Sequence, residues 1–401
     1  MSQMVTVTKE NDGSLDSGRK SRPSHWANDQ GTKFANPWPS FRDVGLTDVA
    51  SMIYQVQAKA PSGAELVASA KQHIPIMTPT FGADMKSDDE CHVKVTFLGH
   101  ACFLLEYPSE EPGKRGVRVL LDPVFSERCS PSKWVGPLRY TKAPCTVQEL
   151  PEIDAVVISH NRKPYLDVAT LADLLENNKQ APHLFLPLNT KRSLSATLQQ
   201  AYKIHELDWW DSRRMDVDGI GSIKVTCTPA QHFSGRGLFD RNASLWASWA
   251  IEGLHRDTGE SRMKCYFGGD TGYCAVEDDK SHDLDESRPY CPAFKEIGDR
   301  FNGFDVAIIP IGAYDPRAFM SPVHCAPIDS VRVFQDIKAR KAIGAHWGAW
   351  RLTSEPVDEP PKRLAGALKL LNIPADAFGV MAIGETRLYE RQDEIDAKSR
   401  Q

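Results

Sequence analysis

The order of apolar runs after residue 92 is the feature that most constrains the fold. Strand-like runs come first, and a stretch of mixed strand and helix patterns follows. More strand-like runs come next, and then a second mixed stretch. Short alternating or continuous apolar runs indicate strands, whereas apolar residues spaced by three or four indicate helices. This order predicts the α/β class, as a four-layer αβ/βα sandwich of two facing sheets with helices outside.

The individual runs place the predicted elements along the chain. Predicted strands are 93–97, 101–107, 117–121, 153–158, 184–188, 223–228, 244–251, 263–267, 306–310, 342–345 and a short one near 380. Predicted helices are 166–177, 190–202, 327–339 and 364–371, with one or two more within 46–73.

The segments around this pattern are predicted to be extensions of one main domain, 91–390. Residues 1–30 are polar and are expected to form a disordered tail. Residues 31–90 are expected to pack on the core, with the aromatic, proline-rich stretch 34–41 as an extended strap. The acidic stretch 275–290 is expected to be a surface insertion loop, and 391–401 a charged tail.

Composition excludes several classes of partner and location. The chain has 401 residues, a net charge of -5 and no basic stripe, so nucleic acid is not expected as a partner. Its nine cysteines form no CxxC pair, and no signal peptide opens the sequence, so we expect reduced thiols and a cytoplasmic protein. No apolar run is long enough to cross a bilayer. A small-molecule or lipid substrate is the expected partner.

Polar residues that can bind a metal follow several of the predicted strands. Strand ends meet along the edges of a sheet, and loops there carry most functional side chains. Imidazole and carboxylate together suit zinc or another divalent ion. The pattern therefore predicts a metal site at a sheet edge, built from Asp122, His160, His232, Asp270 and His346.

The motifs around these residues are specific as a set. They are 36–39 (NPWP), 98–101 (LGHA), 122–126 (DPVFS), 159–161 (SHN), 229–232 (PAQH), 269–273 (GDTGY) and 346–348 (HWG). With these motifs the chain resembles the metallo-β-lactamase-fold superfamily. It is most similar to the branch of N-acyl-phosphatidylethanolamine-hydrolysing phospholipase D, from about residue 34 to 385. The resemblance implies a metallo-β-lactamase-like sandwich with an N-terminal extension.

The resemblance also implies a function and a ligand set. The family uses two zinc ions, which share an aspartate ligand, to activate water for attack on a phosphodiester. By position, His160, His232, Asp270 and His346 match metal ligands, with Asp270 shared between the ions. Asp122 matches the aspartate that orients the ligand loop.

One hexapeptide departs from the family pattern. His160-Asn161-Arg162-Lys163-Pro164-Tyr165 stands where the relatives carry His-x-His-x-Asp-His. Arg162, Pro164 and Tyr165 thus replace three ligands, and none of them is a usual zinc ligand. The second ion would retain only Asp270 and His346. We therefore expect at most one zinc or other divalent ion, held by His160, His232 and Asp270 with His346 nearby, or no ion at all.

Three functions are compatible with this departure. The first is a one-metal hydrolase of a lipid or small-molecule ester or phosphodiester, in which Asp270 orients the water. The second is a metal-free enzyme for cyclisation, isomerisation or elimination. In that case Arg162 and Lys163 would replace the metal charge, and Tyr165 and the histidines would transfer protons. The third is an inactive ligand-binding relic.

Further candidates come from neighbouring loops and from the relatives. His100 is a candidate supporting residue, and His324 is a candidate catalytic residue in a loop that lines the mouth of the site in the relatives. The relatives also bind membranes through an apolar patch and form dimers. The resemblance therefore implies peripheral membrane contact and a homodimer.

Overall fold

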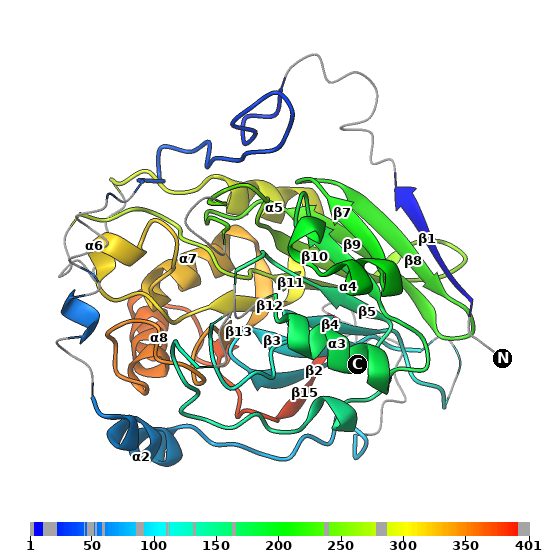
Figure 1. Ribbon diagram of the computed structural model, residues 1–401, viewed down its shortest axis with the longest axis horizontal. Coiled ribbons are helices and arrows are strands. Elements are labelled where there is room, and N and C mark those ends of the chain that lie inside the picture. The colour runs from blue at the N-terminus through cyan, green and yellow to red at the C-terminus, as the bar shows by residue number, and fades with distance from the viewer. Residues whose placement is uncertain are drawn as a thin grey trace.

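Two mixed β-sheets form the body of the computed structural model (Figure 1). The structure describes residues 4–10, 22–43, 45, 52, 54–57, 61–85, 92–109, 111, 113–130, 134–162, 166–235, 240–277 and 287–391. In spatial order, the first sheet consists of β1 (Val5–Glu10), β8 (Ser212–Val217), β9 (Gly221–Thr228), β10 (Ser248–Leu254), β11 (Ser261–Phe267), β12 (Phe304–Pro310), β13 (Ala339–Ala345) and β14 (Phe378–Gly379).

The second sheet carries most of the early part of the chain. In spatial order, it consists of β15 (Thr386–Glu390), β2 (His92–Gly99), β3 (Cys102–Glu106), β4 (Arg118–Leu121), β5 (Ala155–Val157), β6 (His183–Pro187) and β7 (Lys203–Leu207). Strands β4 to β7 run parallel, as do β11 to β14. Parallel neighbours end at the same edge, so the loops after β4 and β5, and those after β11 and β13, are brought together in pairs.

Helices cover the outer faces of both sheets (Figure 1). They are α2 (Gly63–His73), α3 (Val168–Asn177), α4 (Ala196–Ala201), α5 (Ala293–Phe301), α6 (Arg317–Met320), α7 (Pro327–Asp336) and α8 (Glu359–Leu370), with 3-10 turns at Val147–Glu149 and Lys191–Ser193. Helix α7 packs on β12 and β13 and contacts α5 and α8, whereas α4 packs on β7 beside α3.

Strand β4 is apolar on both faces because its successive residues point into two different apolar cores. Val119 and Leu121 belong to the large core that includes both sheets, whereas Leu120 belongs to a second core. That second core includes Leu171 and Leu174 of α3. Successive strand residues point to opposite faces, so a strand between two apolar layers must be apolar throughout. The predicted α/β sandwich with outer helices is confirmed.

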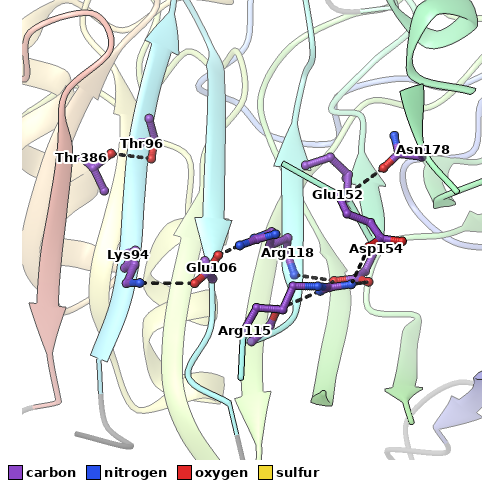
Figure 2. Close-up of polar contacts among 11 residues, drawn as sticks. Lys94, Thr96, Glu106, Arg115, Arg118, Glu152, Asp154, Asn178 and Thr386 are labelled. Atoms are coloured by element: carbon purple, nitrogen blue, oxygen red, sulfur yellow. Dashed lines mark hydrogen bonds and ion pairs between the residues drawn. The ribbon is translucent and has the colours of Figure 1, made fainter. Parts of the chain in front are cut away.

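A ladder of charges holds the edge of the second sheet at which β3 ends and β4 begins (Figure 2). Arg115 donates two hydrogen bonds to Asp154, at 2.6 and 2.9 Å, and the Arg118 backbone N–H donates to the same carboxylate at 2.8 Å. Glu106 accepts from the Arg118 side chain and, at 3.4 Å, from Lys94. Paired charges with little exposure are screened less by salt than surface pairs. The ladder therefore fixes the relative positions of β2 to β5.

Several sequence expectations need correction. Residues 4–10 are not a disordered tail, because β1 pairs with the edge strand β8. The β-branched alternation Val5, Thr6, Val7, Thr8 suits that pairing. His25 and Trp26 are also ordered, since both bond to Asp208.

Other differences concern single elements. The predicted helix 190–202 is a 3-10 turn followed by the short α4, and the helix expected to end at residue 339 ends at Asp336. Strands β7 and β8 were not predicted. Residues 278–286 of the predicted insertion loop and 392–401 of the predicted tail lie outside the described residues. Among the residues that are described, no helix is both long and apolar enough to cross a bilayer.

Candidate metal centre

Five ligand candidates lie immediately beyond strands of the two sheets. Asp122 directly follows β4, and His346 directly follows β13. His160, His232 and Asp270 each lie three or four residues after β5, β9 and β11. All five side chains are buried. The sheet ends thus bring together residues that are more than 200 positions apart in the sequence, as the strand pattern predicts.

Asp270 lies at the centre of this group. Its Oδ2 atom is 3.8 Å from His232 Nε2 and 4.0 Å from His160 Nε2. Its other oxygen, Oδ1, is 3.1 Å from His346 Nε2. The carboxylate therefore faces imidazole nitrogens on both sides, as a ligand shared between two metal positions would.

Two groups of three donors meet at Asp270. One consists of His160, His232 and Asp270, and the other of Asp270, His324 and His346, with the donor atoms of each group within 4.8 Å of one another. The expectation that only Asp270 and His346 remain at the second position has to be changed, because His324 joins them. His324 lies on the loop after α6, whose approach to β13 could not be inferred from strand periodicity.

A chain of hydrogen bonds orients the His160 ring. The Ser159 hydroxyl donates to Asp122 Oδ2 at 2.5 Å and lies 2.9 Å from His160 Nδ1, and the Ser159 N–H donates to Asp122 Oδ1 at 2.7 Å. Because the Ser159 hydroxyl donates its proton to Asp122, it can only accept a hydrogen bond from His160. The Nδ1 atom of His160 must therefore carry a proton. His160 Nε2 is then the acceptor directed at Asp270, which is how outer-shell partners prepare histidine for a metal.

His232 is oriented in the same way by a backbone carbonyl. Its Nδ1 lies 2.9 Å from the Val323 carbonyl oxygen and must donate to it. Its Nε2 atom is buried and has no hydrogen-bond partner among the described residues, and the same is true of His324 Nδ1. A buried polar atom without a hydrogen bond costs about 1–3 kcal/mol. A divalent ion would satisfy such nitrogens, so the donor set fits a zinc-type ion.

The protonation states of His160, His232 and Asp270 suit metal binding, whereas the shift at His346 favours a proton that an ion would have to displace. Burial, reinforced by the Arg162 charge, lowers the pKa of His160 to about 3 and holds the pKa of His232 well below its usual range. Burial alone would raise the pKa of Asp270, but His346 beside it holds that pKa well below the usual range. Burial works against the charged form of His346, yet Asp270 raises its pKa. Neutral imidazoles and an ionised carboxylate are the forms that bind metals.

The backbone of the centre is held in an uncommon conformation. His100, Asp122 and His346 have φ angles of 60°, 38° and 62°, in the left-handed region that non-glycine residues seldom occupy. The His346 N–H donates to the His100 carbonyl at 2.9 Å, and the two rings lie 4.4 Å apart. His100 supports His346 but belongs to neither donor group. Strain of this kind is concentrated at functional sites.

Arg162, which occupies a ligand position of the relatives, is not one of the donors. Its side chain is exposed, and its guanidinium lies 4.7 Å from the centroid of the Phe233 ring. Lys163, Pro164 and Tyr165 lie outside the described residues, so their predicted roles remain predictions.

The N-terminal strap contributes to the centre in a way that was not predicted. Asn36 donates to the His232 carbonyl at 2.8 Å, and the Ser40 hydroxyl donates to Gln231 Oε1 at 2.6 Å. The Gln231 amide donates to the Pro322 carbonyl at 2.9 Å. The strap thus links the loop of His232 to the loop of His324. The NPWP motif and Gln231 were visible in the sequence as family signals, but their contacts were not.

Comparisons with known proteins identify the family to which the chain is similar. Residues 117–347 match the family described as "Beta-lactamase superfamily domain". The chain is 32% identical over 342 residues to the N-acyl-phosphatidylethanolamine-hydrolyzing phospholipase D 1 of Caenorhabditis elegans, covering 83% of this chain and 86% of that protein.

Two further relatives are similar over most of this chain. The mitochondrial N-acyl-phosphatidylethanolamine-hydrolyzing phospholipase D of Saccharomyces cerevisiae is 30% identical over 293 residues, which are 73% of this chain and 54% of that protein. A metal-dependent hydrolase of Pelotomaculum thermopropionicum is 24% identical over 278 residues, covering 69% of this chain and 92% of that protein.

Proposed function

The chain belongs to the beta-lactamase superfamily, and from that premise we propose that it is a metal-dependent hydrolase of an ester or phosphodiester bond. The observation that carries the proposal is the pair of donor groups that share Asp270. A bound zinc or similar ion supplies positive charge to the reacting centre and lowers the pKa of water toward neutrality.

The residues of the chain have distinct tasks in this proposal. His160 and His232 each present Nε2 toward Asp270, because Ser159 and the Val323 carbonyl hold their Nδ1 protons. Asp270 provides an ionised oxygen to each donor group. Burial of these side chains excludes bulk water, so the charges act in a medium of low effective dielectric constant.

We propose two metal positions rather than the single position expected from the sequence. The first is His160, His232 and Asp270, and the second is Asp270, His324 and His346. Three protein donors are the usual number for a catalytic zinc. His324 therefore makes up for one of the two ligands lost at residues 164 and 165 and brings this group to three donors.

The names of two relatives support a proposal for the substrate class. Two of the relatives at 30% identity or more are named as enzymes that hydrolyse N-acyl-phosphatidylethanolamine, a lipid. We propose that this chain hydrolyses a phosphodiester or ester of a lipid or small molecule.

One contact favours a second candidate, which is metal-free acid–base chemistry. His346 Nε2 lies 3.1 Å from Asp270, and its pKa is raised by that carboxylate against the effect of burial. Such a pair can hold and transfer a proton during elimination or isomerisation.

Metal content and turnover together separate the two candidates. The freshly purified protein is analysed for metals and assayed on phosphodiester and ester substrates, before and after removal of metal with a chelator. The hydrolase proposal predicts that turnover disappears with the metal and returns with added zinc. Turnover that survives complete removal of metal would favour the acid–base candidate.

A further inference from the structure

The Arg162 side chain forms a second binding feature beside the candidate metal centre. Its guanidinium lies 4.7 Å from the centroid of the Phe233 ring, and that ring lies 4.8 Å from the His232 ring. A guanidinium on an aromatic face is attracted by the ring quadrupole. The stack leaves the N–H donors at the rim of the guanidinium plane available for other partners.

The charge of Arg162 is not neutralised by the part of the chain that the structure describes. No carboxylate among those residues lies within ion-pair distance of its guanidinium. Arg241, whose guanidinium lies 5.5 Å from the same ring centroid, differs because it pairs with Asp43 at 3.1 Å. Of the two cations on this ring, Arg162 is therefore the one without a carboxylate partner among the described residues.

The position of this charge relates it to the metal centre. Arg162 is two residues after His160, and Phe233 directly follows His232. An anion held by Arg162 would thus lie within electrostatic reach of the donor group around Asp270.

We infer that Arg162 binds the anionic oxygens of the substrate, which belong to a phosphodiester or a carboxylate next to the bond that is cleaved. The planar fork of N–H donors matches two coplanar oxygens, and the Phe233 face holds the fork in place. The role in turnover rests on the proposed function, whereas binding of an oxyanion by Arg162 does not.

Inorganic phosphate and acetate are the probes for the binding step. Calorimetric titration compares the wild-type protein with Arg162→Gln, Arg162→Lys and Arg241→Gln at equal ionic strength and equal metal content. We expect Arg162→Gln to raise the phosphate Kd by at least about tenfold, because a charge-assisted hydrogen-bond pair is lost. Arg162→Lys retains the charge but loses the fork, and is expected to fall between Arg162→Gln and the wild type.

The Arg241→Gln variant is the control, and acetate is the second ligand in the comparison. Arg241→Gln is expected to change the Kd less than about threefold, since that guanidinium already has a carboxylate partner. A larger effect on phosphate than on acetate would identify a phosphodiester as the substrate group, and the reverse would identify a carboxylate. Equal Kd values for the wild type and Arg162→Gln would overturn the inference.

Measurements of kcat/KM on a charged and a neutral substrate separate this inference from the proposed function. Bis(p-nitrophenyl) phosphate is charged, and p-nitrophenyl acetate is neutral. Arg162→Gln should lower kcat/KM for the charged substrate by at least about tenfold, and its effect on the neutral substrate should be at least about threefold smaller. If neither substrate is hydrolysed but the phosphate Kd still depends on Arg162, the proposed function fails and the anion site stands.

Discussion

The Asn36 side-chain amide donates a hydrogen bond to the carbonyl oxygen of His232, 196 residues further along the chain. His232 belongs to one donor group of the metal centre, and its own Nδ1 is held by the carbonyl of Val323. The ligand is therefore positioned from two sides by parts of the chain that are distant in sequence. The strap is consequently part of the machinery that presents His232 to a metal.

We predict that Asn36→Ala weakens zinc binding more than it weakens the fold. Loss of one hydrogen bond is expected to cost about 1 kcal/mol of unfolding free energy, whereas loss of an outer-shell partner lowers metal affinity by about tenfold or more. Zinc affinity is measured by competition with a chromogenic chelator, and stability by urea unfolding. Asn28→Ala is the matched control, because Asn28 lies shortly before the strap and its side chain bonds to exposed Thr32. Equal zinc affinity in both variants would show that the strap has no positioning role.

Ser159→Ala should reduce zinc affinity by about 10- to 100-fold, the usual effect of removing an outer-shell partner. The substitution breaks the connection between Asp122 and His160 Nδ1, so the imidazole is free to adopt the wrong tautomer. Ser212→Ala controls for loss of a buried hydroxyl, since Ser212 bonds to Thr226 in the first sheet. An unchanged zinc affinity in Ser159→Ala would contradict the proposed orientation of His160.

Much of this centre could be predicted from the sequence, for a physical reason. Strands of alternating or continuous apolar residues are readable, and parallel strands end at one edge, so Asp122 could be placed with His160, and Asp270 with His346, in advance. The family resemblance pointed to His324 as a candidate at the mouth of the site, but the contacts of His324 and Asn36 could not be predicted, because these residues lie on an irregular loop and an extended strap. Their positions depend on tertiary contacts such as the Asn36 to His232 bond, and no periodicity encodes those.

The strand β1 shows a second limit of sequence reasoning. Its polar surroundings suggested disorder, yet the segment pairs with β8 along six residues. An edge strand needs only backbone partners and modest burial, so its composition can remain polar. Whether such a segment is ordered depends on whether another sheet strand, here β8, offers it unpaired backbone groups.

Asp154→Asn should destabilise the fold without changing the metal centre. Arg115 is only slightly exposed and donates two hydrogen bonds to Asp154, so the variant would leave it with the more distant Glu152, at 3.9 Å, as its charge partner. We expect a loss of about 2–4 kcal/mol in the free energy of unfolding, read from urea denaturation. The zinc content should equal that of the wild type, because Asp154 precedes β5 and the ligands follow it. A loss of metal at full stability would contradict this separation.

Stability should fall as the pH is lowered from 6.5 toward 4, partly because of the His183 and His205 pair. Their ring nitrogens lie 3.0 Å apart, and burial together with neighbouring positive charge lowers the pKa of each to about 4. The unfolded chain takes up protons near pH 6.5, so in this window it binds more protons than the folded chain and is favoured.

His205→Gln tests that contribution because it removes one titrating ring. The urea midpoint of this variant should drop less between pH 7 and pH 5 than that of the wild type. The buried ligand histidines, whose pKa values are also lowered, are present in both proteins and contribute equally to both drops. An identical drop in the two proteins would show that the pair does not contribute.

The stoichiometry of zinc binding tests the central claim most directly. Metal-free protein is titrated with zinc and the bound metal is counted for the wild type, His324→Ala and Asp270→Ala. Two donor groups that share Asp270 predict about two ions for the wild type, about one for His324→Ala and almost none for Asp270→Ala. A wild-type protein that binds no zinc, or binds one ion regardless of His324, would contradict the account.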